Sequence, residues 1–194
     1  MPKHNIQELK FRRRREAKTN YHKRLALVKG DMARIVVRKS NRGILGQVVK
    51  YNEKGDVVSY SVDSCELVKM GWPSRSNRPT AYLTGMLLAS KISEADRKVE
   101  YILDIGLSSP VANSIPFVFA KGAMDNGMKV RGEFTIDEGI YNGSLTAKYA
   151  DALKKEEPKR YEAQFGAYIK GKIVPDSMPK LFIEAKEKIK SAKK

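Results

Sequence analysis

Cysteine and histidine are scarce in this chain. Its 194 residues include one cysteine, Cys65, and two histidines, His4 and His22. A single thiol excludes an intrachain disulfide, and one cysteine with two histidines provides too few ligands for a structural zinc site. The same scarcity leaves no supportable Ser/His/Asp or Cys/His catalytic set. We therefore expect no catalytic residues, no metal site and no cofactor.

Long apolar runs are lacking as well. No stretch approaches the roughly 20 apolar residues of a membrane span, and the N-terminus lacks the apolar segment of a signal peptide. We expect a cytoplasmic protein that has no membrane partner. Hydrophobic residues make up 41% of the chain, which is enough for one sizeable core but hardly for a second independent domain.

Acidic residues are outnumbered, with 38 Lys/Arg against 22 Asp/Glu and a formal net charge of +16. Such a balance favours a polyanionic partner and leaves nucleic acid and an anionic membrane surface as the candidates. We expect no small-molecule substrate. Residues 1–42 hold 14 Lys/Arg against 3 Asp/Glu, residues 43–142 hold 11 against 12, and residues 143–194 hold 13 against 7. A nearly neutral middle with two basic ends is typical of a folded body that presents arms to phosphate groups.

The middle of the chain predicts an α/β fold. Three short segments rich in β-branched residues and joined by turn sequences predict sequential antiparallel strands at Ala33–Arg38, Gly46–Tyr51 and Val57–Val62. The nearly continuous apolar segment Val99–Ile105 predicts a central strand, and the helix expected before it at Thr80–Ile92 implies a right-handed crossover. We expect a mixed sheet that begins with three antiparallel strands and has helices on both faces.

Shorter signals complete the expected architecture. Further helices are predicted at Ser64–Met70, Phe117–Asn126, Leu145–Leu153, Tyr161–Ile169 and Lys180–Lys190. We divide the chain into a basic RNA-binding arm with a short helix at 1–30, an α/β core at 31–135 and a helical C-terminal extension at 136–194.

The basic arm is the strongest candidate for a binding site. Its cations, which can neutralise several phosphates, are Arg12, Arg13, Arg14, Arg15, Lys18, Lys23 and Arg24. A solvated charge run or a localisation signal would have the same composition. The interleaved Phe11, Tyr21 and His22 favour RNA, because planar side chains offer stacking faces for unpaired bases.

Two further groups of cations are candidates for the same partner. The first predicted strand and its turn carry Arg34, Arg38, Lys39, Ser40, Asn41 and Arg42, which a sheet edge could present next to the arm; a merely polar hairpin is the alternative. The loop with Trp72, Arg75 and Arg78 offers a large aromatic between cations. An exposed indole would indicate contact with a partner, although a tryptophan buried under its own loop is the more common case.

Other functions can be weighed on the same residues. Gly166–Lys172 meets the glycine and lysine spacing of a phosphate-binding Walker A loop, but Ile173 stands where a hydroxyl should bind magnesium, so we regard the match as chance. A metal-dependent nuclease would need several converging carboxylates, and only Asp104 and Asp63 are candidates. A DNA-compacting protein would share the charge but not a preference for RNA.

Several segments together resemble a known family. They are FRRRREAKTNYHKRL at 11–25, RKSN at 38–41, AYLTG at 81–85, LDIGLSSP at 103–110, KGAMDNGM at 121–128 and YADALKKEEPKRYEAQFGAYIKGKI at 149–173. In order and over most of the chain, they resemble the archaeal and eukaryotic form of ribosomal protein eighteen of the large subunit. The compact length is closer to the archaeal version, and the last residues, 175–194, have no counterpart that we can quote.

The resemblance implies a fold of the ribonuclease H type without catalysis. It also implies binding to 5S rRNA in the central protuberance of the large ribosomal subunit, with the large 23S-type rRNA and neighbouring proteins, including large-subunit protein five, as further partners. In that family the basic arm and the adjoining strand and turn contact 5S rRNA. The matching residues here are Arg12 to Arg15, Lys18, Tyr21, His22, Arg24, Arg38, Lys39, Ser40 and Asn41.

Overall fold

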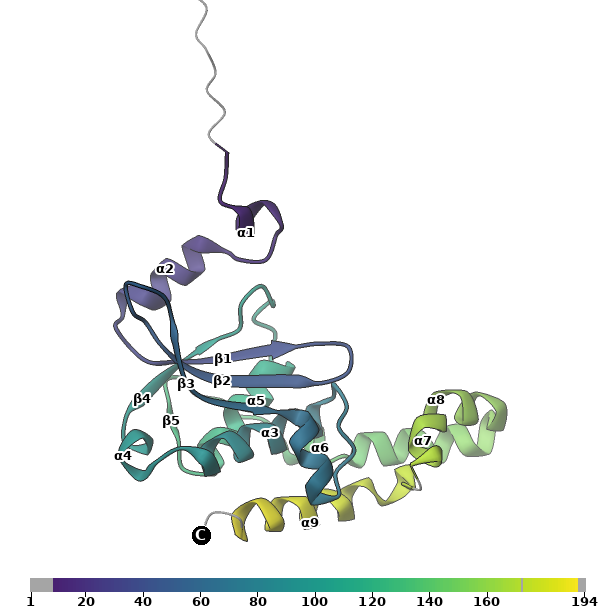
Figure 1. Cartoon of the computed structure of the whole chain (residues 1–194). Helices are drawn as coiled ribbons and strands as arrows, with labels where there is room; N and C mark the ends of the chain where they lie inside the picture. Colours follow the sequence, from purple (N-terminus) through teal and green to yellow (C-terminus); the bar gives the residue numbers. More distant parts are fainter. Residues whose placement is uncertain (1–8, 172, 192–194) are drawn as a thin grey trace, which may run out of the picture.

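The computed structural model of the protein describes residues 9–171 and 173–191, which form a five-stranded mixed sheet with helices around it (Figure 1). The strand order is β3-β2-β1-β4-β5. β1 (Arg34–Lys39), β2 (Ile44–Lys50) and β3 (Val57–Asp63) pair antiparallel, whereas β4 (Glu100–Asp104) runs parallel to β1 and β5 (Lys129–Val130) runs parallel to β4. The predicted α/β class and mixed sheet are confirmed.

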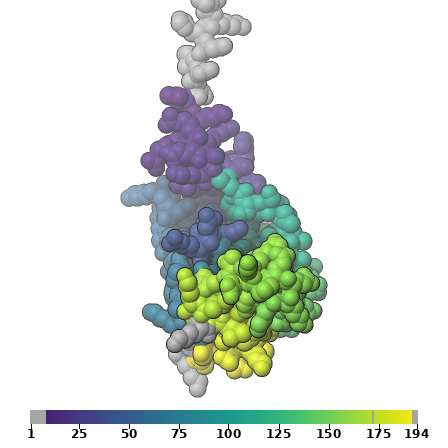
Figure 2. Space-filling view, turned by 90° about the vertical axis from the view of Figure 1, so that its right-hand side faces the viewer, coloured from purple at the N-terminus to yellow at the C-terminus, as the bar shows by residue number. Residues whose placement is uncertain are grey.

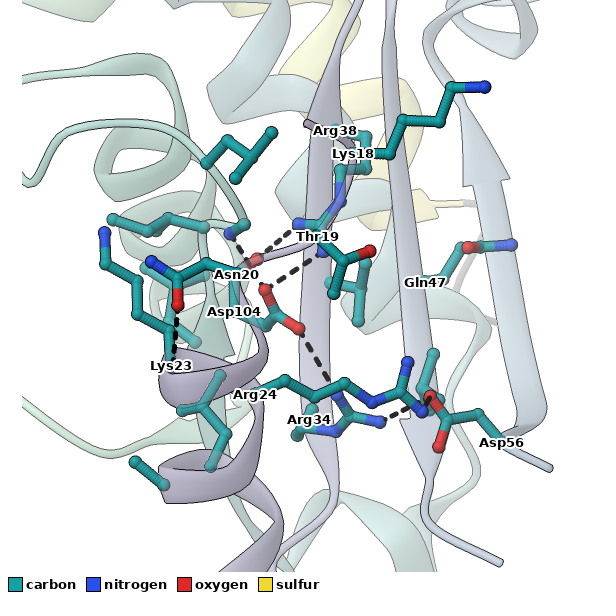
Figure 3. Close-up of a pocket in the computed structure, with 18 of the residues that line it drawn as sticks. Lys18, Thr19, Asn20, Lys23, Arg24, Arg34, Arg38, Gln47, Asp56 and Asp104 are labelled. Carbon is teal, nitrogen blue, oxygen red and sulfur yellow. Dashed lines mark hydrogen bonds and ion pairs between the residues drawn. The ribbon is translucent and has the colours of Figure 1, made fainter. Parts of the chain in front are cut away.

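One face of this sheet packs against α3 (Arg78–Lys91) and α5 (Ile115–Asp125). Because side chains alternate along a strand, Ile35 and Val37 of β1 enter this core, whereas Val36 between them lies on the opposite face. Above that opposite face lies α2 (Tyr21–Lys29) (Figure 1). A cleft separates this helix from the sheet (Figure 3).

The two core helices cross with their backbones almost in contact. A Cβ atom added to Gly85 of α3 would lie 2.1 Å from the Phe119 carbonyl oxygen of α5, and one added to Gly122 of α5 would lie 2.1 Å from the Tyr82 carbonyl oxygen. Only glycine fits at either position, because such distances are far below van der Waals contact. These glycines bring the helices close enough to form one layer under the sheet.

The helix boundaries follow local chemistry. α3 begins at Arg78, two residues before the predicted start, because proline is tolerated in the first helical turn and the Asn77 side chain accepts a hydrogen bond of 3.0 Å from the Thr80 backbone N–H. The predicted helix at Ser64–Met70 is a 3-10 helix, η1, which ends as expected at Gly71 with φ of +87°.

Several short elements were not predicted, three of them within the folded body before α7. These three are α4 (Glu94–Arg97), β5 and α6 (Glu138–Tyr141). Segments of two to four residues are too short to show a helical or strand period, so only their tertiary neighbours reveal them.

The C-terminal part makes a helical hairpin and then returns to the body. α7 (Ser144–Glu156) and α8 (Pro158–Lys170) pack around a small core of Ala150, Leu153 and Phe165 and extend to the side of the sheet (Figures 1 and 2). After the 3-10 turn η2 (Pro175–Ser177), helix α9 (Met178–Ser191) runs back beneath α3.

The final helix completes the main core, although the resemblance to the family covered no part of this helix. Phe182 of α9 is buried, and its ring lies 5.5 Å from the ring of Tyr82, 6.0 Å from that of Trp72 and 6.2 Å from that of Tyr141. Burial of such a ring contributes roughly 2–3 kcal/mol. Up to Ser191, this segment is therefore part of the folded body.

Of the two alternatives weighed for Trp72, the structure shows the buried ring, which removes the basis for listing it as an RNA-binding residue. Trp72 is 1% exposed, and its indole N–H donates to the Thr80 hydroxyl over 2.9 Å. The ring lies under its own loop and against α9, so both its apolar surface and its polar atom are satisfied inside the protein.

The N-terminal arm extends from the end of the molecule opposite to α9 (Figure 2). Helix α1 (Arg12–Arg15) is a single turn, and α2 follows after a bend in which Ala17 has φ of +49°. Asn20 caps α2 by accepting a hydrogen bond from the Lys23 backbone N–H. Residues 1–8 of the predicted arm, with His4, lie outside the described residues.

Candidate nucleic-acid interface

A cleft of about 590 Å³ separates α2 and the bend before it from the outer face of the sheet. Figure 3 shows side chains entering it from both sides. The predicted RNA-binding residues that line it are Arg13, Lys18, Lys23, Arg24, Arg34 and Arg38. The arm and the first strand are thus brought to one site, although they are separate in sequence.

The floor of the cleft is a chain of ion pairs. Arg34 is 3% exposed and donates to Asp56 over 2.8 Å and to Asp104 over 3.3 Å. Arg24 of α2 reaches the same Asp56 oxygen over 3.0 Å, and Arg38 reaches the other oxygen of Asp104 over 3.0 Å. Two carboxylates shared among three arginines leave the floor with excess positive charge.

Arg38 is held in place by the backbone around it. One terminal nitrogen of its guanidinium group, Nη1, donates to the carbonyl oxygens of Val37 and Asp104, each over 2.9 Å. The group lies against Gly106, where an added Cβ would be 2.9 Å from it and where φ is +63°. Gly106 thus accommodates both the turn and the arginine head.

The two carboxylates that we considered for a nuclease have other roles. Asp104 is held by Arg34 and Arg38, and Asp63 caps η1 by accepting a hydrogen bond of 2.7 Å from the Cys65 backbone N–H. In residues 9–171 and 173–191, His, Cys, Asp and Glu side chains form no group of three or more that could hold a metal ion. These positions therefore support an electrostatic role rather than metal-assisted hydrolysis.

The arm displays exposed cations beside the cleft, which Arg13 itself lines. Arg12, Arg13, Arg14 and Arg15 are all exposed, and Arg13 is oriented by a 2.8 Å hydrogen bond from Nε to the Thr19 hydroxyl. The rings of Phe11 and Tyr21 lie 5.5 Å apart. Arg14, Tyr21 and His22 line a second, smaller hollow of about 280 Å³. Planar and cationic groups therefore lie next to each other along the arm.

The turn after β1 is also exposed. Lys39, Ser40, Asn41 and Arg42 all face solvent, and the Ser40 hydroxyl and backbone N–H both donate to the Gly43 carbonyl oxygen. The expected placement of the first strand at a sheet edge is wrong, however, because β1 lies between β2 and β4. Arg34 is buried, and its charge is turned to Asp56 and Asp104 rather than to the surface.

Arg75 and Arg78 are exposed but do not line the cleft. Arg75 lies over the ring of Tyr168 in α8, 5.4 Å from its centroid, and Arg78 donates to the Asn113 carbonyl oxygen over 2.9 Å. These contacts hold the 72–78 loop against Tyr168 and Asn113, at a distance from the basic arm.

Several residues of the cleft were missed in the sequence. They are Gln47, Asp56, Leu107 and Pro110, among others. Asp56 sits in a turn, where an acidic residue is ordinary, and its pairing with Arg24 and Arg34 depends on the tertiary fold. The LDIGLSSP segment was a signal that could have indicated Leu107 and Pro110.

The Walker-like segment is not a phosphate-binding loop. Gly166 to Lys170 lies within α8, so its amides are bonded along a helix instead of being free to cradle phosphate. Lys172, the last residue of that match, lies outside the described residues. In the described residues, no helix combines the length and apolar character required to cross a membrane.

A basic cleft whose few carboxylates are already paired is typical of proteins that bind polyanions, and comparison with known proteins is in agreement. Residues 6–98 match the family described as "Ribosomal large subunit proteins 60S L5, and 50S L18". The chain is 41% identical over 186 residues to the "Large ribosomal subunit protein uL18" of Sulfurisphaera tokodaii, covering 94% of each chain.

The chain belongs to this family of large-subunit ribosomal proteins, as the resemblance of its motifs indicated. It is a structural constituent of the large ribosomal subunit and not an enzyme, and it associates there with rRNA and ribosomal proteins.

Proposed function

We propose that this chain binds 5S rRNA and helps attach it to the large-subunit rRNA in the central protuberance. The observation that carries the proposal is the convergence of the basic arm, α2 and β1 on one cationic cleft. Arg13, Lys18 and Lys23 can hold phosphates at its mouth, and the arm's exposed aromatics can stack on unpaired bases.

The other predicted residues take different parts in this proposal. The exposed turn from Lys39 to Arg42 extends the phosphate-binding surface. Arg34 acts as a positioning residue, because its buried guanidinium fixes Asp56 and Asp104 and thereby Arg24 and Arg38. Arg75 and Arg78 are available for other neighbours, among which we include the 23S-type rRNA and large-subunit protein five. The three-strand antiparallel start of the sheet supports the ribonuclease H type of fold.

The test is a comparison of ligands. The full chain is titrated with 5S rRNA, with a structured RNA of equal length and with duplex DNA of matched charge at one salt concentration. Our proposal predicts clearly tighter binding of 5S rRNA. Equal binding of all three ligands would mean that the chain binds polyanions in general. Equal binding of the two RNAs, both tighter than DNA, would mean that the chain binds RNA without preference for 5S rRNA.

A further inference from the structure

We propose that the cleft under α2 receives a single unstacked base of the bound RNA, a step that rests on the proposed function and specifies how its site works. The cleft volume of about 590 Å³ lies in the range of roughly 300–1,000 Å³ typical of small-ligand pockets. It is therefore large enough for one nucleotide and too small for a duplex.

The walls of the cleft have the chemistry of a base pocket. Apolar side chains come from α2, from the sheet and from the loop after β4; they include Leu27, Val36, Val58, Leu103, Leu107 and Pro110. A cleft that served phosphates alone would not need apolar walls on several sides, whereas the two faces of a base do.

The floor holds polar atoms that lack partners. The Nε atom of Arg34 and the Oδ1 atom of Asp56 are buried, and neither has a hydrogen-bond partner among the described residues. Leaving such atoms unsatisfied is costly. Both atoms expose less than 1 Å² of surface, so they lie beneath the surface that a base would touch. The groups that a base edge can reach are the part-exposed guanidinium groups of Arg24 and Arg38, which donate hydrogen bonds and suit an edge with acceptor atoms.

The mouth of the cleft suits the phosphates on either side of an inserted base. Arg13, Lys18 and Lys23 come from the arm and α2, and the Lys18 and Lys23 side chains are exposed. Figure 3 shows Lys18 and Lys23 around the Arg34–Asp104 floor. A nucleotide thus places its ring between apolar walls, its edge toward Arg24 and Arg38, and its phosphates at the cations of the mouth.

The entry of a base can be blocked without changing charge. The variant Val36→Phe adds a ring inside the cleft, whereas Val57→Phe makes the same substitution on β3 at an exposed position that does not line it. Thermal unfolding of both variants checks the fold. The complex with 5S rRNA is then probed with reagents that modify the hydrogen-bonding edges of unpaired bases, nucleotide by nucleotide.

We expect one unpaired base to be protected by the wild-type chain and by Val57→Phe, and to become reactive again with Val36→Phe, with affinity reduced roughly tenfold. Removing that base from the RNA should weaken wild-type binding by the same factor and make the RNA insensitive to Val36→Phe. The abasic RNA gives a result even if Val36→Phe does not fold.

Two results would overturn the inference. If wild-type protein binds 5S rRNA tightly without protecting any unpaired base, or if removing the protected base leaves affinity unchanged, the cleft holds phosphate only and the proposed function still stands. If the wild-type chain has no preference for 5S rRNA, the proposed function and the base pocket fail together.

Discussion

Arg34 and Asp104 form a buried ion pair between two parallel neighbours in the sheet, with Nη1 of Arg34 3.3 Å from Oδ2 of Asp104. The residues are far apart in sequence, and each also contacts a second partner of opposite charge. Asp104, a carboxylate on an interior strand, therefore holds two arginines of the cationic cleft in place. Because Asp104 is paired with arginines, it supports a cationic surface for RNA in this α/β sheet and does not act as a hydrolytic carboxylate.

Replacing Asp104 with Asn should destabilise the fold by about 3 kcal/mol, because Arg34 and Arg38 would no longer share a negative charge. Denaturant unfolding measures the effect. The exposed Asp31→Asn is the matched control and should stay within about 0.5 kcal/mol of wild type. An Asp104→Asn protein as stable as the control would show that the ion pair does not hold the cleft together.

The contact between α3 and α5 makes a second prediction. Gly85→Ala places a methyl group against the Phe119 carbonyl oxygen and should cost about 3 kcal/mol through overpacking. Gly166→Ala in α8 meets no atom within 4 Å and should stabilise the protein by about 0.5–1 kcal/mol through helix propensity. A Gly85→Ala protein that is as stable as wild type would contradict the close crossing of α3 and α5.

Docking of α9 can be tested at neighbouring residues. Phe182→Ala removes a ring that is 1% exposed and should cost about 4 kcal/mol. Ile183 is 56% exposed, and its replacement with Ala should cost about 0.5 kcal/mol or less. Hydrogen exchange along α9 would show whether Phe182→Ala releases the helix; unchanged protection would mean that other contacts hold it.

Asp96 gives a prediction about pH. Hydrogen bonds from the Tyr60 hydroxyl and then from Ser93 lower the pKa of Asp96 below its ordinary value. A carboxyl whose pKa falls on folding adds stability above its unfolded pKa, about 3.9, and loses it as pH falls through the lower folded pKa.

Tyr60→Phe should therefore raise the pKa of Asp96 and reduce the loss of stability in acid. The carboxyl chemical shift of Asp96 during a pH titration measures the pKa directly, and thermal midpoints at neutral and acid pH measure the consequence. If the titration midpoint is the same in both proteins, the Tyr60 hydrogen bond is not the cause of the shift.

Local signals in the sequence were enough for the sheet class and for most helices. The strands of the meander are short, β-branched and separated by turns, so their identity and order could be predicted, as could the Gly71 end of η1. Interactions between distant residues could not. The burial of Trp72 depends on α9, and the interior position of β1 depends on its pairing with β4, from which it is separated in sequence by two strands and by η1, α3 and α4.

The candidate site, like the fold, could be predicted from the sequence only in part. The arm was recognisable from its charge and aromatics, because those features lie together in the sequence. The cleft was not, since its walls come from α2, four strands and the loop after β4, and Asp56 acquires a partner only after folding. Arg34 and Arg38 could not be distinguished from the sequence. In the structure the guanidinium group of Arg34 is buried, whereas that of Arg38 is half-exposed.

The most direct measurement is the salt dependence of 5S rRNA affinity for wild-type protein and for the triple variant of Arg13, Arg14 and Arg15 to Ala. Removing one phosphate-binding cation should flatten the slope of log affinity against log salt by about one unit. Removing the same charge from the distal hairpin, by Lys148, Lys155 and Lys159 to Ala, is the control. We expect a flatter slope and weaker binding only for the arm variant; equal slopes for the two variants would contradict an arm-based interface.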